Sequence, residues 1–179
     1  MTWQKKNEGK TCYIAELGTG TAAIPLALCA ELKYLNIKSV DCSGQILDVA
    51  ARNIRNYKNL LAPRKNKLEL VQSYLFSEVN FPSKLDFIVS NPPYICSNKI
   101  TDLQTEVSQF EPRIAIDGGT DGLFFYNYLL DVGASLLKND GKMIYVSGET
   151  ISIDLDQQLV RAGYKIDRII SYRTIQNES

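Results

Sequence analysis

The stretch TCYIAELGTG, residues 11–20, decides the fold class. Its apolar part, residues 11–17, predicts a short buried strand, and Gly18-Thr19-Gly20 predicts the tight turn that follows. Apolar residues then recur over a wide face between Ile24 and Leu32, which predicts a helix. Pro25 suits the first turn of that helix, where a missing N–H does no harm. The order strand, glycine turn, helix predicts the first unit of an α/β fold.

The alternation of strand and helix patterns continues along the chain. Further strands are expected at residues 38–41, 68–72, 85–90, 142–147 and 165–172. Helices are expected at residues 43–61, from Asp121 to Leu137, and from Leu155 to about Gly163, with Ser43 as N-cap and Pro63 as terminator of the first. A proline-rich loop at 91–120 and a turn at 139–141 separate them. Repeated strand–helix–strand units predict a Rossmann-like, doubly wound, mostly parallel α/β sheet with helices on both faces.

The composition is that of one packed domain over residues 1–179. Twenty basic side chains balance twenty acidic ones, which argues against, without excluding, a nucleic-acid partner. No run approaches the about 20 apolar residues that a membrane helix needs, so no membrane association is expected.

The sequence contains no histidine. Ser-His-Asp and Cys-His catalysis and imidazole-bound zinc are therefore excluded. The cysteines form no CxxC pair, which predicts reduced thiols, a cytoplasmic location and no metal site; they are Cys12, Cys29, Cys42 and Cys96.

The glycine turn and Asp41 together predict a nucleoside cofactor. Glycines let the backbone approach a ligand closely, and the N-terminus of the next helix favours negative groups. Asp41 ends the second strand about 20 residues later, where a ribose hydroxyl pair needs an acceptor. The alternative for Asp41 is a cap on the following helix, because Ser43 is close by.

The stretch Ser90-Asn91-Pro92-Pro93-Tyr94 follows the strand at 85–90, at the edge where ligands bind in open α/β sheets. Two prolines stiffen this turn. The Asn91 side chain and the Pro92 carbonyl offer two acceptors that suit a planar NH2 group, and Tyr94 offers a flat wall beside it. The alternative is a rigid loop that caps the sheet.

These motifs resemble those of S-adenosylmethionine-dependent methyltransferases that modify a planar nitrogen. Further matching motifs are Glu106-Val107, Phe110-Glu111-Pro112-Arg113 and Asp117-Gly118-Gly119-Thr120-Asp121-Gly122-Leu123. Over residues 11–163 the chain is similar to the HemK/PrmC family, the release factor glutamine methyltransferases. The resemblance implies a catalytic domain of the class I methyltransferase type, S-adenosylmethionine as cofactor and a peptide chain release factor as protein substrate.

The resemblance also implies roles for individual residues. Cofactor binding is implied for Glu16, Gly18, Thr19, Gly20, Asp41, Cys42, Ser73, Tyr74 and Asn91. Catalysis is implied for Asn91, Pro92, Pro93 and Tyr94, and substrate binding for Asn91, Pro92, Tyr94 and Arg113. In this scheme Asn91 and Pro92 accept hydrogen bonds from the substrate glutamine amide. Arg113 either steers the substrate or pairs with Asp117 or Glu111.

The chain departs from the family pattern in several places. Ala22 stands where a third glycine is usual, at little expected cost, and Ser73-Tyr74 replaces a small residue followed by aspartate. The family's N-terminal helical domain and its final antiparallel strand are not expected in this sequence. A separate partner chain is one way in which the helical domain could be supplied. Two other functions stay open: an adenine N6-methyltransferase of DNA or RNA, and a non-catalytic or partner-dependent cofactor-binding subunit.

Overall fold

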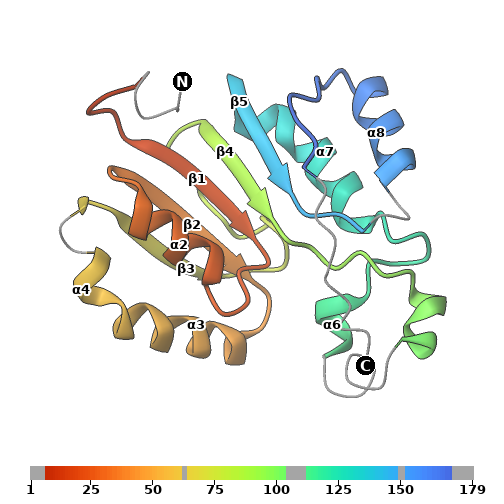
Figure 1. The fold of residues 1–179 in the computed structure, drawn as a ribbon, viewed down its shortest axis with the longest axis horizontal. Helices are drawn as coiled ribbons and strands as arrows, with labels where there is room; N and C mark the ends of the chain where they lie inside the picture. The colour runs from red at the N-terminus through yellow and green to blue at the C-terminus, as the bar shows by residue number, and fades with distance from the viewer. Residues whose placement is uncertain (1–6, 62–63, 104–111, 149–151, 171–179) are drawn as a thin grey trace.

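The computed structural model describes residues 7–61, 64–103, 112–148 and 152–170 (Figure 1). Its strands are β1 (Cys12–Leu17), β2 (Leu35–Asp41), β3 (Lys67–Gln72), β4 (Leu85–Ser90) and β5 (Leu137–Tyr145). They form one sheet in the order β3-β2-β1-β4-β5, and every neighbouring pair is parallel. The predicted parallel, doubly wound α/β sheet is confirmed.

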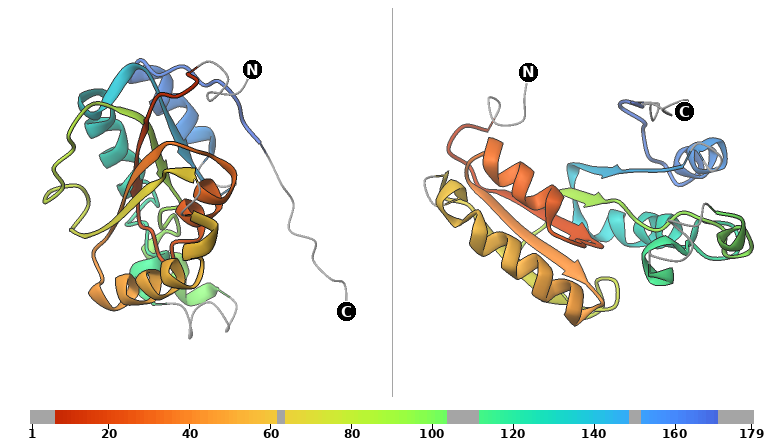
Figure 2. Two further views of the ribbon diagram at one scale, coloured as in Figure 1. Left: turned by 90° about the vertical axis from the view of Figure 1, so that its left-hand side faces the viewer. Right: turned by 60° about the horizontal axis from the view of Figure 1, so that its bottom comes forward.

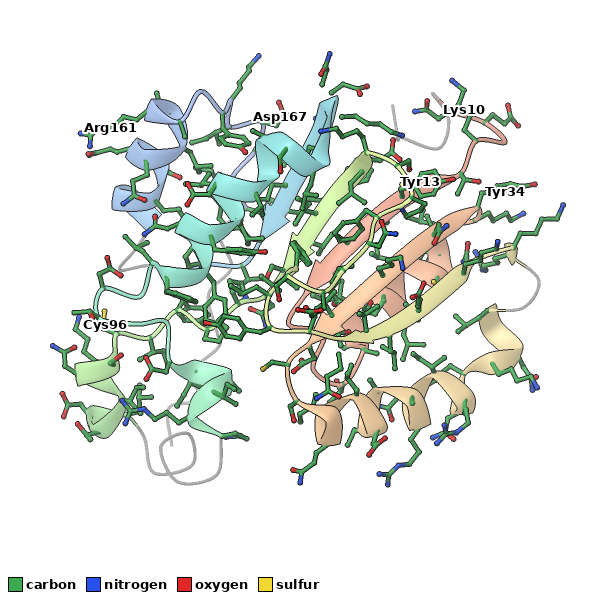
Figure 3. All side chains as sticks on the ribbon, turned by 180° about the vertical axis from the view of Figure 1, so that it is seen from behind. Lys10, Tyr13, Tyr34, Cys96, Arg161 and Asp167 are labelled. Carbon is green, nitrogen blue, oxygen red and sulfur yellow. The ribbon has the colours of Figure 1, made fainter. Side chains whose placement is uncertain are left out.

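Helices cover both faces of this sheet. They are α2 (Ala23–Glu31), α3 (Gly44–Asn56), α4 (Lys58–Leu61), the 3-10 helix η2 (Ser97–Asp102), α6 (Arg113–Ile116), α7 (Phe124–Leu136) and α8 (Ser152–Arg161). Helix α2 lies over one face and α7 over the other (Figures 1 and 3). In the part of the chain that the structure describes, none of these helices is both long and apolar enough to cross a bilayer.

Side-chain alternation along β1 divides the core into two layers. Cys12 and Ile14 are buried in the cluster on the α2 side, together with Cys29 of that helix. Ala15 and Leu17 point to the other face, into the cluster that contains Leu129 of α7. A third cluster joins α7 to α8; its buried members are Leu123, Tyr126, Leu155 and Leu159. The sheet is thus packed on both faces, which leaves its carboxyl edge for a ligand.

Several predicted boundaries shift by a few residues. Strand β2 begins at Leu35 rather than at residue 38, and the helix predicted over 43–61 is divided at Tyr57 into α3 and α4. Helix α7 begins after Asp121, whose Oδ1 accepts a hydrogen bond from Leu123 N at 2.9 Å. The loop at 91–120 contains η2 and α6 (Figure 2). Pro63 and the motif residues Glu106, Val107, Phe110 and Glu111 lie outside the described residues.

The turn predicted at 139–141 is wrong, because these residues lie within β5. Leu85 pairs with Leu137 and Phe87 pairs with Lys142, so residues 138–141 form an irregularity opposite Asp86. A Cβ on Gly141 would lie 2.9 Å from the Leu85 carbonyl oxygen, which explains why a glycine occupies this crowded position. The turn-forming residues allow a bulge in the strand instead of ending it.

The sixth strand predicted at 165–172 is also wrong over its described part. Residues 165–170 have no strand conformation, and residues 171 and 172 lie outside the described ranges. Ile169 and Ile170 are 64% and 74% exposed, and Asp167 contacts β5 through an ion pair with Lys142. An alternating pattern forms a strand only where a partner edge accepts its backbone hydrogen bonds.

Candidate active site

The predicted cofactor and catalytic residues meet at the carboxyl edge of the sheet. Gly18, Cys42, Ser73 and Asn91 each directly follow one of the strands β1 to β4, and these strands are parallel neighbours. Because parallel strands end at the same edge, residues more than 70 positions apart in the chain face one region. Helices η2 and α6 lie beyond this edge of the sheet (Figures 1 and 2).

The glycine turn, residues 18–20, is hydrogen-bonded to the end of β2. The amides of Gly18 and Thr19 donate to the Val40 carbonyl at 2.9 and 3.0 Å, and Gly20 N donates to Asp41 Oδ2 at 3.0 Å. Gly18 and Gly20 have φ of 72° and 55°, which requires glycine for an unstrained turn. Ala22, in place of the third glycine, also has a positive φ of 65°. Its left-handed conformation costs about 1–2 kcal/mol, more than the small cost expected from the sequence.

Asp41 is not the cap of α3, because its carboxylate bonds the amide of Ser43, which is itself the N-cap of that helix. Oδ1 accepts from Ser43 N at 3.1 Å while Oδ2 accepts from Gly20 N. Ser43 is the N-cap of α3, as predicted, since its Oγ accepts from Ile46 N at 3.4 Å. A carboxylate has about four acceptor positions, so two are left for ribose hydroxyls.

Glu16 lies buried beneath the glycine turn and is 1% exposed. Its Oε2 accepts a hydrogen bond from Thr19 Oγ1 at 2.6 Å, whereas its buried Oε1 has no hydrogen-bond partner among the described residues. Burial raises the pKa of Glu16, the hydroxyls of Thr19 and Ser39 oppose that rise, and the nearby Asp41 carboxylate adds to it. An acceptor without a partner at this position fits the cationic end of S-adenosylmethionine.

The residues after β2 and β3 differ in their accessibility to a ligand. Ser73 is buried, and its Oγ accepts from Glu78 N at 3.0 Å and donates to the Tyr74 carbonyl at 3.4 Å. The Tyr74 side chain is 62% exposed. Cys42 is half-buried, and burial together with Asp41 raises the pKa of its thiol. The Ser73 hydroxyl thus uses its donor and one of its two acceptor lone pairs locally, and one lone pair is left to accept from a ligand.

The Asn91-Pro92-Pro93-Tyr94 turn starts directly beside the glycine turn. Ser90 pairs with Leu17 in the sheet, and its Oγ donates to the Leu17 carbonyl at 2.9 Å. Pro92 is buried, whereas Asn91 is exposed and its side chain has no hydrogen bond to any described residue. The turn is therefore fixed at its base while the Asn91 amide is available to a substrate.

The structure pairs Arg113 with Asp117, one of the alternatives considered from the sequence. Arg113 Nε lies 2.9 Å from Asp117 Oδ2, and the Arg113 side chain is 68% exposed. Asp117 also accepts from Ser97 Oγ and Gly119 N, and these hydrogen bonds lower its pKa to about 2. This pair shapes the loop, and the substrate-binding role of Arg113 stays a prediction.

Two residues near Tyr94, Gly148 and Tyr126, were not predicted from the sequence as part of the site. A Cβ on Gly148 would lie 3.0 Å from Tyr94 Cδ2, so the aromatic ring packs on the backbone there. Tyr126 is buried, and its hydroxyl donates to the Val146 carbonyl at 2.7 Å. Burial and the neighbouring Tyr94 raise the pKa of Tyr126. Of these two residues only Tyr126 could have been found from the sequence, because it places a hydroxyl on the apolar face of a predicted helix.

The fold and the site together define a class I S-adenosylmethionine-dependent methyltransferase. The fold matches a solved methyltransferase from Pyrococcus furiosus with a TM-score of 0.66 and 19% identity, over 95% of this chain and 74% of that one. The chain belongs to the Eco57I restriction-modification methylase family, whose model matches residues 25–173.

Curated relatives confirm the resemblance to release factor glutamine methyltransferases. The protein of that name from Thermosynechococcus vestitus is 37% identical over 139 residues, which is 78% of this chain and 45% of the relative. A bifunctional methyltransferase from Rickettsia bellii is 32% identical over 164 residues, 92% of this chain and 28% of the relative. The chain thus spans less than half the length of each of these relatives.

Proposed function

We propose that this domain transfers a methyl group from S-adenosylmethionine to the side-chain amide of the glutamine in the Gly-Gly-Gln loop of a peptide chain release factor. The observation that carries this proposal is the position of the Asn91-Pro92-Pro93-Tyr94 turn. It begins next to the glycine turn, and the Asn91 amide is exposed with no hydrogen bond to a described residue. The names of the curated relatives support the same substrate.

In the proposed reaction the protein supplies orientation rather than a strong base. Asn91 Oδ1 and the Pro92 carbonyl accept the two N–H groups of the glutamine amide, and Tyr94 bounds its plane. This arrangement would direct the nitrogen lone pair toward the methyl carbon, and near-attack geometry of this kind contributes on the order of 7–11 kcal/mol in favourable cases. Transfer would form the N–CH3 bond, break the S–CH3 bond and release S-adenosylhomocysteine, and one amide proton would pass to solvent water.

The cofactor supplies the electrophilic methyl group when bound. Glu16 and the backbone of residues 18–20 would hold its methionine end, and Asp41 its ribose. Glu16 would offer the cationic part of that end its Oε1, which is buried and has no hydrogen-bond partner among the described residues.

Methylation of the adenine N6 amine is the second candidate, and the family description favours it because it names restriction-modification methylases. The same two acceptors suit an exocyclic amine. Against this candidate stands the balance of twenty basic and twenty acidic residues, since enzymes that act on nucleic acid usually concentrate positive charge.

A methyl-transfer assay distinguishes these functions. The purified protein is incubated with methyl-labelled S-adenosylmethionine and either a release-factor domain, the same domain with the loop glutamine changed to alanine, or duplex DNA. We expect label only in the glutamine-containing domain. Transfer to DNA alone would move the assignment to the adenine methyltransferase, and absence of cofactor binding in calorimetry would favour the non-catalytic or partner-dependent subunit.

Substitution of Asn91 tests the acceptor role, with Asn98 as a matched control. Asn98 is also an exposed asparagine and lies in η2. We expect Asn91→Ala to reduce transfer by about 100-fold or more without loss of cofactor affinity, because the substrate amide loses its orienting acceptor. Asn98→Ala should retain full activity. An Asn91→Ala protein as active as the Asn98→Ala control contradicts the proposed mechanism.

A further inference from the structure

A second segment of the loop, residues 116–119, packs against the Asn91-Pro92-Pro93-Tyr94 turn. Residues 95–97 lie alongside residues 116–119, and we call this pair of segments the clasp. Ile95 N donates to the Ile116 carbonyl at 3.0 Å, and Gly118 N donates back to the Ile95 carbonyl at 2.8 Å. Ser97 N donates to the Gly119 carbonyl at 2.9 Å. The chain immediately after Tyr94 is therefore paired like a short parallel ladder.

The Asp117 carboxylate links the two segments of the clasp by hydrogen bonds. Oδ1 accepts from Ser97 Oγ at 2.5 Å and from Gly119 N at 3.0 Å, and Oδ2 accepts from Arg113 Nε at 2.9 Å. These donors come from three places in the loop, so one carboxylate fixes the relative position of both segments. Hydrogen bonds to a charged acceptor are the stronger kind.

Gly118 brings the clasp into direct contact with the catalytic turn. A Cβ at this position would lie 2.8 Å from Tyr94 Cα and 2.9 Å from the Pro93 carbonyl oxygen. Both are backbone atoms, so they cannot move aside without moving the turn itself. On the other side the Tyr94 ring packs against Gly148. The turn is held between two glycines, one at its backbone and one at its aromatic ring.

We propose that Asp117 and Gly118 are positioning residues for methyl transfer. They fix the backbone of Pro93 and Tyr94, and through it the direction of the two acceptors on Asn91 and Pro92. This inference rests on the proposed function, in which those acceptors orient the substrate amide. It extends the machinery to two residues that need not touch the substrate or the cofactor.

Gly118→Ala tests the backbone contact, and Gly141→Ala is its matched control. A Cβ on Gly141 would be crowded just as severely, 2.9 Å from the Leu85 carbonyl oxygen, at the start of β4. This is the end of the sheet opposite to the clasp, as the positions of Tyr13 and Cys96 show in Figure 3. We expect Gly118→Ala to lower kcat by about 100-fold, with KM for the release factor and the cofactor Kd within about twofold of wild type. Gly141→Ala should lower Tm and leave kcat unchanged.

Asp117 is tested by comparing asparagine with alanine. Asp117→Asn keeps an acceptor oxygen for Ser97 and Gly119, whereas Asp117→Ala removes all three side-chain hydrogen bonds of this residue. We expect kcat to fall at least about tenfold in the alanine variant and to be largely restored in the asparagine variant. Equal kcat values in Gly118→Ala and Gly141→Ala would overturn the proposal, as would a parallel loss of kcat and cofactor affinity.

A measurement without substrate keeps this proposal separate from the proposed function. In NMR spectra, the side-chain amide of Asn91 should shift in Gly118→Ala and in Asp117→Ala but not in Gly141→Ala. If the wild-type protein transfers no methyl to the release factor, the proposed function fails and this spectrum decides the positioning role. An unchanged Asn91 signal in both clasp variants refutes it.

Discussion

Replacing Glu16 by glutamine should stabilise the protein and weaken cofactor binding. Glu16 is buried, one of its oxygens has no partner among the described residues, and burial raises its pKa. Glutamine has nearly the same shape, carries no charge and keeps an oxygen that accepts the hydrogen bond from Thr19. The substitution therefore removes the cost of burying a charge while it preserves the packing.

The size of the effect follows from the buried oxygen. Glutamine keeps a polar atom where Oε1 lies, so the gain comes from the charge that it removes, and Glu16→Gln should increase the free energy of unfolding at pH 7 by about 1–3 kcal/mol. Each kcal/mol raises Tm by about 2–4 °C in a chain of this size. The lost charge should weaken S-adenosylmethionine binding by about 10–100-fold, the usual value of a charge-assisted hydrogen bond.

The pH dependence has a definite sign. The pKa of Glu16 is raised above its ordinary value of 4.5, so above that pH the folded state binds more protons than the unfolded state. The contribution of Glu16 to stability is complete below pH 4.5 and is lost as pH rises through the folded pKa. The stability gained by Glu16→Gln should therefore be small at acidic pH and grow toward neutral pH.

Urea unfolding followed by far-UV circular dichroism between pH 4.5 and 8 measures this difference. Glu69→Gln is the control, because Glu69 is an exposed strand residue paired with Lys38, and surface pairs of this kind contribute about 0–1 kcal/mol. Calorimetric titration with S-adenosylmethionine gives the cofactor affinity. A Glu16→Gln protein that is less stable than wild type at pH 7, or a stability difference that does not change with pH, would refute the reasoning.

Three further outcomes follow from local contacts. Ser43→Ala should lower the free energy of unfolding by about 0.5–1 kcal/mol in urea titrations, because α3 loses its N-cap. Asp86→Ala should cost about 1–3 kcal/mol in the same assay, since the buried carboxylate accepts from a backbone N–H at 2.9 Å and from a lysine at 2.7 Å. Burial raises the thiol pKa of Cys12 and Cys29 to about 12 and 11, so both should resist thiol labelling until the protein unfolds. Cys42 should label in the folded protein, more slowly with cofactor present.

The sequence correctly predicted those structural features that are determined by residues close together in the chain. The strand at 85–90 appears with the predicted limits, and Ser43 caps the helix that follows β2. Both signals act within a few residues: the apolar run that forms a buried strand, and the hydroxyl that reaches an N–H three positions later. The grouping of the glycine turn with residues 91–94 was also predictable, because parallel strands share one carboxyl edge.

The register of β5, with its irregularity at residues 138–141, could not be predicted from the sequence. A turn-forming tripeptide at 139–141 adopts a bulge because β4 pairs with the residues on both sides of it. Likewise, residues 165–170 alternate like a strand but have no strand partner in the structure. Whether such a segment forms a strand depends on a partner strand from a distant part of the chain, and the periodicity of the segment carries no information about that partner.

The sequence alone determined the fold class and predicted the sheet edge of the candidate site with the residues that follow each strand there, since these follow from periodicity, turn chemistry and strand direction. Only the tertiary structure decided the close contact of Gly118 with Tyr94, the Glu16 oxygen that has no hydrogen-bond partner among the described residues, and the local hydrogen bonds of Ser73. The physical reason is that burial and van der Waals contact are properties of pairs of atoms. Their partners come from distant segments, and a local pattern specifies only one member of each pair.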